Sequence, residues 1–101
     1  MMSIGDVMRR LRDSGFDFSA AVQIDFNIDF ENGLPDSSVS SLLKREFPDA
    51  AISFEADYVL VQLVRPVSYE LVTSMQAKLT GLTAQYGGVC ESWGVMHNAA
   101  R

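Results

Sequence analysis

The sequence predicts an α+β domain of the ferredoxin-like kind, a βαββαβ sandwich with a four-stranded antiparallel sheet and an extra N-terminal helix. A segment near residue 22 alternates apolar and polar residues, which is typical of a strand with one buried face. After a first helix, the patterns run strand, helix, strand, strand, helix, strand, as in two tandem βαβ units. The chain has 101 residues, so we expect one domain over residues 1–101.

The first helix is predicted from apolar residues that recur every three or four positions. Ser3 is its expected cap, and Ser14-Gly15 is its expected end, since glycine tolerates the left-handed conformation of many helix stops. Its arginines fall mostly on the side of the helix opposite these apolar residues. They form either a small basic patch or an ordinary solvated helix face. The apolar stripe is Ile4, Val7, Met8 and Leu11, and the arginines are Arg9, Arg10 and Arg12.

The segment from Val22 to Phe30 carries the clearest pattern in the chain. One-sided burial suits an antiparallel sheet with an open side. The apolar positions are Val22, Ile24, Phe26, Ile28 and Phe30, and the polar positions are Gln23, Asp25, Asn27 and Asp29. Asp25 and Asp29 are therefore expected to lie on the open face of the sheet.

Turn signals divide the rest of the chain. Asn32-Gly33 and Leu34-Pro35-Asp36 precede a second helix, with an apolar stripe from Val39 to Phe47, that ends at Pro48. A short strand around Ile52–Phe54, a turn at Ala56-Asp57 and a central strand, Tyr58–Val64, follow. Ser68 is the expected cap of the third helix, Gly87-Gly88 its end, and Val89–Met96 the last strand.

Two further expectations concern the third helix and the sheet. Gly81 lies inside the helix, where glycine costs about 1 kcal/mol relative to alanine, and close packing against a neighbour would explain it. Right-handed crossovers would place the second and third helices on one face of the sheet. The opposite face would then stay open unless the first helix, a partner or a second copy covers it.

The charge and cysteine content narrow the classes of function. The net charge is −5 with a sequence pI of about 4.6, so phosphates are repelled and no direct nucleic-acid contact is expected. A basic protein surface fits better, although many ordinary domains are mildly acidic. Cys90, the single cysteine, excludes an internal disulfide and a cysteine-based zinc site. We expect no metal, no cofactor and no membrane span, and the start lacks the features of a signal peptide, which favours the cytoplasm.

The residues predict no catalytic site. His97 is the single histidine and lies near the end of the chain, and Cys90 reads as a small core or interface side chain. Asp25 and Asp29 would be roughly 13 Å apart along a strand, too far to act on one bond. The polar row of this strand, from Gln23 to Asp29, also lacks the aromatic side chains on which an RNA-binding sheet stacks bases. The row suits a set of acceptors on an exposed surface, either merely solvated or used as a contact site.

Trp93 has two interpretations. Strict alternation in the last strand puts Glu91 and Trp93 on one face, and Cys90, Ser92 and Gly94 on the other. If the small side packs on the helices, Trp93 points to the open face, where it could bind a cationic partner together with Glu91. Alternatively, Trp93 is a core anchor packed against the first helix. Both remain open at this point.

With these elements in place, the chain resembles the RraB family of protein regulators of ribonuclease E. The similarity runs from about Ile4 to Val95. It includes the helix end at Gly15-Phe16-Asp17, the strand Val22 to Phe30, the long third helix and the stretch from Tyr86-Gly87-Gly88 to Trp93-Gly94. The family motif tyrosine-aspartate-glycine-tryptophan reads Cys90-Glu91-Ser92-Trp93 here, with the tryptophan kept and the acid conservatively replaced.

The resemblance implies a ferredoxin-like fold and a non-catalytic regulator that binds the basic scaffold region of the ribonuclease and alters RNA decay. The expected contact residues for a protein partner are Asp25, Asp29, Glu91 and Trp93. The alternatives are a small-molecule-sensing or dimerising module, with Leu60 and Val64 pairing two open faces, and an acidic immunity-type protein. Either a monomer or a homodimer is compatible with the sequence.

Overall fold

The elements follow the predicted order in the computed structural model, which describes residues 4–31, 33, 37–55 and 58–96. They are α1 (Ile4–Asp13), β1 (Ala21–Phe30), α2 (Ser37–Glu46), β2 (Ala51–Phe54), β3 (Tyr58–Pro66), α3 (Tyr69–Thr83), the short 3-10 helix η1 (Ala84–Tyr86) and β4 (Gly88–Met96). The predicted α+β class is confirmed. Several predicted signals lie outside the described residues: Ser3, Asn32, Leu34, Pro35, Asp36, the Ala56-Asp57 turn and His97.

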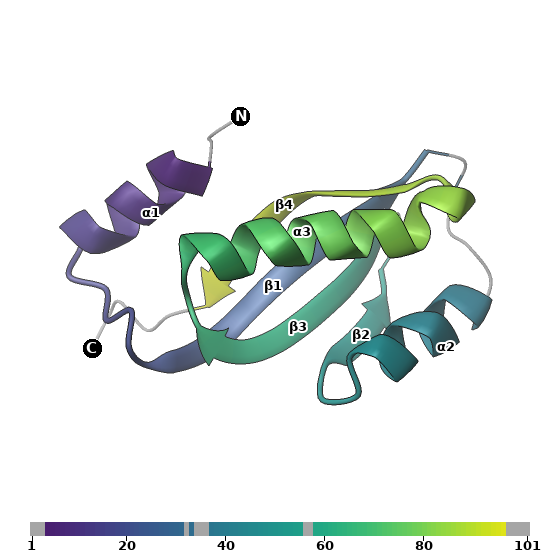
Figure 1. The fold of residues 1–101 in the computed structure, drawn as a ribbon, viewed down its shortest axis with the longest axis horizontal. Helices are drawn as coiled ribbons and strands as arrows, with labels where there is room; N and C mark the ends of the chain where they lie inside the picture. The colour runs from purple at the N-terminus through teal and green to yellow at the C-terminus, as the bar shows by residue number, and fades with distance from the viewer. Residues whose placement is uncertain (1–3, 32, 34–36, 56–57, 97–101) are drawn as a thin grey trace.

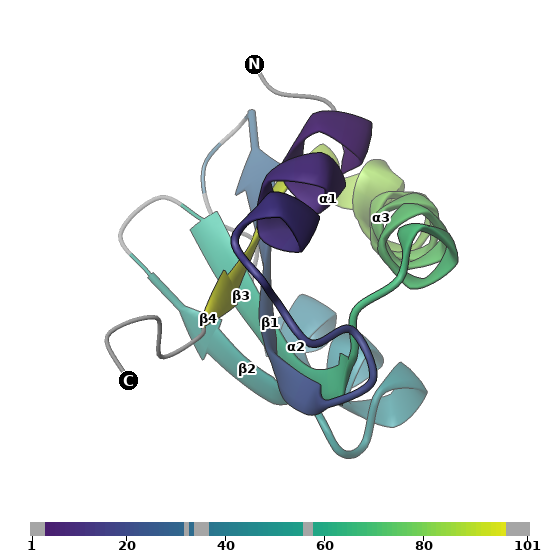
Figure 2. The same cartoon turned by 90° about the vertical axis from the view of Figure 1, so that its left-hand side faces the viewer.

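The four strands form one antiparallel sheet in the order β2-β3-β1-β4. Strand β1 is central and pairs with both β3 and β4, while β2 and β4 are the edges. The helices lie on one side of the sheet, with α3 running along it and α1 packed beside α3 (Figures 1 and 2). None of the described helices covers the other side, which we call the open face.

The alternation predicted for β1 is confirmed, because its buried residues face the helices and its polar residues face away. Strand β3 continues the covered side, and α2 and α3 close it. The core therefore lies between the sheet and the helices. Its members include Ile24, Phe26 and Ile28 of β1, Val59, Val61 and Leu63 of β3, Val39 and Leu43 of α2, and Val72, Met75 and Leu79 of α3.

The helix ends follow the predicted chemistry. Gly15 ends α1 with a φ of 84°, where the N–H of Phe16 donates to the carbonyl of Leu11 over 3.0 Å. The hydroxyl of Ser68 caps α3 by accepting from the N–H of Leu71, also over 3.0 Å. Gly87 follows η1 with a φ of 83°, which turns the chain into β4.

The explanation offered for Gly81 is wrong. Gly81 is exposed, and a Cβ atom added there would meet no heavy atom within 4 Å. The close approach occurs at Gly88 instead. A Cβ atom on Gly88 would lie 2.6 Å from the Cβ of Thr83 and 2.8 Å from a ring carbon of Phe30. Here α3 and β1 approach β4 so closely that no side chain fits.

Candidate functional site: the open face of the sheet

The open face is a polar strip centred on β1. Each polar residue of β1 lies opposite one residue of β3 and one of β4. Asp25 lies between Gln62 and Gly94, Asn27 between Leu60 and Ser92, Asp29 between Tyr58 and Val89, and Gln23 is opposite Val64. Ala51 and Ser53 of the edge strand β2 extend the same face, because they pair with Gln62 and Leu60. The prediction that Asp25 and Asp29 share this face is confirmed.

Two amides orient the carboxylate of Asp25. The Nε2 atom of Gln23 donates to Oδ1 of Asp25 over 3.2 Å, and Nε2 of Gln62 donates to the same oxygen over 3.1 Å. Both donors come from the face itself, one from β1 and one from β3. Because they hold one oxygen, the orientation of the carboxylate is set before any partner arrives, and less entropy is lost on binding.

The charge of the open face is negative. Asp25 and Asp29 occupy its strand positions, and none of the residues that the register places on this face is a lysine or arginine. Asp29 is exposed. At the β2 edge of the sheet, the hydroxyl of Ser53 donates to Oε2 of Glu55 over 3.1 Å. Across the middle of the face, Nδ2 of Asn27 donates to Oγ of Ser92 over 3.3 Å. Acceptors with amide and hydroxyl neighbours thus line this face, and the described strand residues add no cation to it.

Trp93 does not lie on this face. Of its two interpretations, the one that places it beside Asp25 and Asp29 is wrong, and the one that packs it on the core agrees with the structure. Trp93 pairs with the buried Phe26 and packs against the core, half-buried, on the covered side. The reason is a β-bulge. Asn27 pairs with Ser92 and the next residue, Ile28, pairs with Cys90, so Glu91 has no partner in β1. Glu91 is exposed at this bulge on the edge strand.

The sequence as a whole matches one family model, RraB, regulator of ribonuclease activity B, over residues 2–95. The chain belongs to the RraB family. This family regulates ribonuclease activity through protein binding and is not a family of catalysts. The chain matches no curated protein and no solved structure.

For this RraB family member, sequence reasoning missed the residues that β3 and β4 bring to the open face. Gln62, Tyr58 and Ser92 become neighbours of the β1 row only through the strand register, which a single strand does not reveal. Leu60 and Val64 do lie on this face, as the pairing hypothesis requires, and Val64 is 58% exposed. The strip therefore has an apolar side along β3.

Cys90 has the properties of a core side chain in this RraB family member. Its side chain is buried on the covered side of β4, and its backbone N–H donates to Oγ1 of Thr80 over 2.9 Å. Burial, with a smaller contribution from the charge of Asp29, raises the pKa of the Cys90 thiol to about 12. The thiolate that nucleophilic or metal chemistry needs is therefore strongly disfavoured.

The residues described for this RraB family member contain no group of three or more histidine, cysteine, aspartate or glutamate side chains arranged to hold a metal ion. Within that same part of the chain, no helix is long and apolar enough to cross a membrane.

Proposed function

We propose that this RraB family member regulates a ribonuclease by binding a basic segment of it on the open face. The observation that carries the proposal is the acidic strip, which none of the described helices covers (Figure 2), together with the pre-oriented carboxylate of Asp25. Asp29 supplies a second, exposed charge at one end of the strip.

A lysine- or arginine-rich segment fits this strip in charge and in its apolar contacts. The ammonium or guanidinium groups would pair with Asp25 and Asp29, while their aliphatic stems pack on Leu60 and Val64 of β3. The resemblance to regulators of ribonuclease E favours the basic scaffold region of that enzyme as the proposed partner, and a change in RNA decay as the proposed outcome. Such binding requires no catalytic group of the chain.

The remaining expectations belong to the same proposal. The strand order β2-β3-β1-β4, with α2 and α3 on one side, supports a ferredoxin-like arrangement in one domain over residues 1–101. Glu91, exposed at the bulge, adds a contact carboxylate at the edge of the sheet. Trp93 would support β4 from the covered side instead of touching the partner. The proposed site of action is the cytoplasm.

The test is equilibrium binding of the purified chain to ribonuclease E and to its scaffold region. A D25N/D29N variant should bind about tenfold more weakly or worse, since charge-assisted hydrogen bonds are lost. Asparagine keeps a carbonyl oxygen for Gln23 and Gln62, so the face should keep its shape. A D13N/E70Q variant, which removes two exposed charges from α1 and α3, serves as the matched control and should bind within about twofold of the wild type.

Equal weakening in both variants would show that only net charge matters and would refute the open face as the site. Binding should also weaken as salt rises from about 0.05 to 0.3 M, because exposed charges are screened. A stable dimer in analytical ultracentrifugation that polar substitutions at Leu60 and Val64 dissociate, and that D25N/D29N does not, would favour the pairing hypothesis over a ribonuclease partner.

A further inference from the structure

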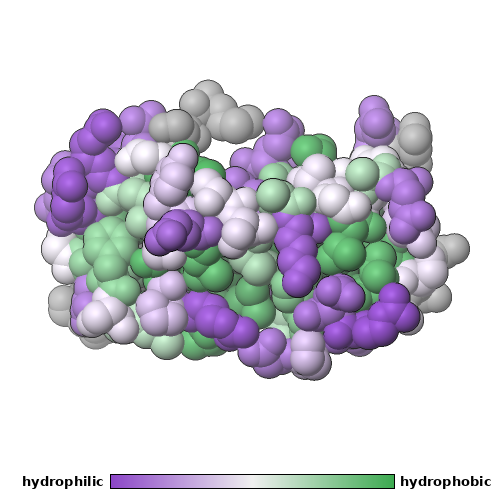
Figure 3. Space-filling model, viewed as in Figure 1, coloured by the Kyte–Doolittle hydropathy of each residue, from purple (hydrophilic) through white to green (hydrophobic). Residues whose placement is uncertain are grey.

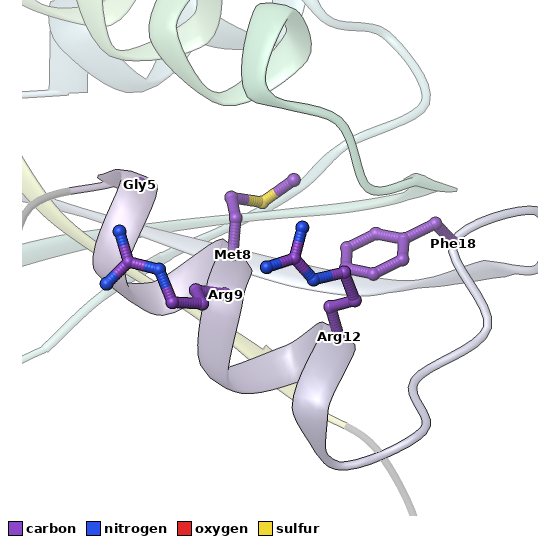
Figure 4. Close-up of a pocket in the computed structure, with 5 residues that line it drawn as sticks. All are labelled: Gly5, Met8, Arg9, Arg12 and Phe18. Carbon is purple, nitrogen blue, oxygen red and sulfur yellow. The ribbon is translucent and has the colours of Figure 1, made fainter.

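A pocket that is open to solvent, called the cavity below, lies beside α1 and is formed by residues that the open face does not use. It has a volume of about 480 Å³ and is lined by Gly5, Met8, Arg9, Arg12 and Phe18 (Figure 4). Cavities that hold small organic ligands measure roughly 300–1,000 Å³. The space is therefore of the right size for one small molecule.

The apolar part of this cavity is fixed by the core. Met8 and Phe18 are half-buried and pack against the core cluster. The rings of Phe16 and Phe18 meet edge to face, with centroids 4.9 Å apart. The carboxylate of Asp17 accepts hydrogen bonds from the N–H and hydroxyl of Ser19 over 2.9 and 2.6 Å, which fixes the turn and lowers the pKa of Asp17. Phe18 thus has a defined place beside Arg12 (Figure 4).

The polar part consists of two guanidinium groups from one face of α1, three residues apart. Arg9 contacts Oδ1 of Asp6 over 3.4 Å, and both side chains are largely exposed, so this pair is weak and easily replaced. Arg12 forms no ion pair with the described residues. Hydrophilic side chains gather over α1 directly above hydrophobic surface in Figure 3. Gly5 adds no side chain to the wall.

We propose that this cavity binds a free nucleoside monophosphate. Its phosphate would lie between Arg9 and Arg12, which match a doubly charged oxyanion better than a single cation does. Its base would pack on Met8 and Phe18, since aromatic side chains accept the flat face of any base. The net charge of −5 repels a long polyanion, whereas a mononucleotide brings only about two charges. The site is separate from the open face and does not depend on the function proposed for it.

Titration calorimetry with adenosine and uridine monophosphate tests the assignment, with adenosine and inorganic phosphate as the two half-ligands. Both nucleotides should bind with a dissociation constant of about 1 mM or below, and each half-ligand about tenfold more weakly. Arg12→Gln should weaken binding about tenfold. Arg10→Gln, the same change on the same helix but outside the cavity lining, should stay within about twofold. Phe18→Leu should weaken the nucleotides but not inorganic phosphate.

Amide shifts in NMR spectra should locate the bound nucleotide at Gly5, Met8 and Phe18 and confirm that each variant is folded. Absence of binding at about 10 mM nucleotide, or equal losses in Arg10→Gln and Arg12→Gln, would overturn the proposal. Tighter binding of a 5′-phosphorylated oligonucleotide would also overturn it, because the ligand would then be the end of a strand. A preference for an acidic aromatic peptide over both nucleotides would do the same.

Discussion

Replacing Gly88 by alanine should destabilise the fold through a contact that cannot relax. The new Cβ atom would lie 2.6 Å from the Cβ of Thr83 and 2.8 Å from a ring carbon of Phe30, whereas ordinary contacts begin at 3.4 Å. Thr83 is fully buried and its hydroxyl donates to the carbonyl of Leu79 over 2.7 Å. Phe30 is 7% exposed. Neither neighbour can move away without disturbing the core.

The size of the effect follows from these two contacts. Overpacking a core costs about 1–3 kcal/mol, and a weakened buried hydrogen bond adds about 0.5–1.5 kcal/mol. We therefore expect Gly88→Ala to lower the free energy of unfolding by about 2–4 kcal/mol, out of a total of about 5–15 kcal/mol for a domain of this kind. Backbone strain does not contribute, because positive φ occurs at Gly87 and not at Gly88.

Urea denaturation followed by circular dichroism measures this change, and Gly81→Ala is the matched control. Gly81 is exposed inside α3, with no atom within 4 Å of an added Cβ, so alanine should raise the free energy of unfolding by up to about 1 kcal/mol. A loss below about 0.5 kcal/mol for Gly88→Ala, or losses of equal size in the two variants, would refute the close approach of α3 and β1 to β4.

Three other predictions follow from single side chains. Because the pKa of Cys90 is raised to about 12, a thiol reagent near pH 8 should label the protein only after unfolding; rapid labelling of the native state would contradict its burial. Arg65 hydrogen-bonds Asp49 over 2.7 Å and lowers the pKa of that carboxyl, so this stabilisation is present above the ordinary pKa of aspartate and is lost as the pH falls through the lowered value. The melting temperature of Arg65→Gln should therefore fall less than that of the wild type between about pH 6 and 3, and identical profiles would argue against the pair. Trp93→Ala should cost about 2–4 kcal/mol in urea denaturation and Trp93→Phe clearly less; a negligible cost in both would mean that the ring is not packed on the core.

The sequence predicted the features of the fold that depend on local periodicity. Strict alternation from Val22 to Phe30 identified β1 and both of its faces, because a period of two survives wherever pairing is regular. Gly15, Ser68 and Gly87 marked real helix ends, because their conformations or side chains satisfy the terminal backbone groups. The helices, the strands and the acidic face of β1 with Asp25 and Asp29 could thus be predicted without tertiary information.

The features that depend on contacts between residues far apart in the sequence could not be predicted from local periodicity. Close packing was expected at Gly81, inside the third helix, whereas the atoms that exclude a side chain lie around Gly88. The amides that orient Asp25 include Gln62, which lies 37 residues away along the chain. Such partners depend on the register between β1 and β3, which each strand alone leaves undetermined.

The bulge at Glu91 has the largest consequence for function. An alternating strand would place Cys90 and Trp93 on opposite faces, but the unpaired residue between Ser92 and Cys90 brings both to the covered side. The chain thereby gains an aromatic side chain against its core, and β4 contributes only Val89, Ser92 and Gly94 to the open face opposite Asp29, Asn27 and Asp25. An aromatic hot spot contributes affinity through burial, which salt barely affects. Because Trp93 packs on the core instead, we expect charge and hydrogen bonds to contribute most of the recognition on the open face, so the regulator we propose should release a basic segment when either is neutralised.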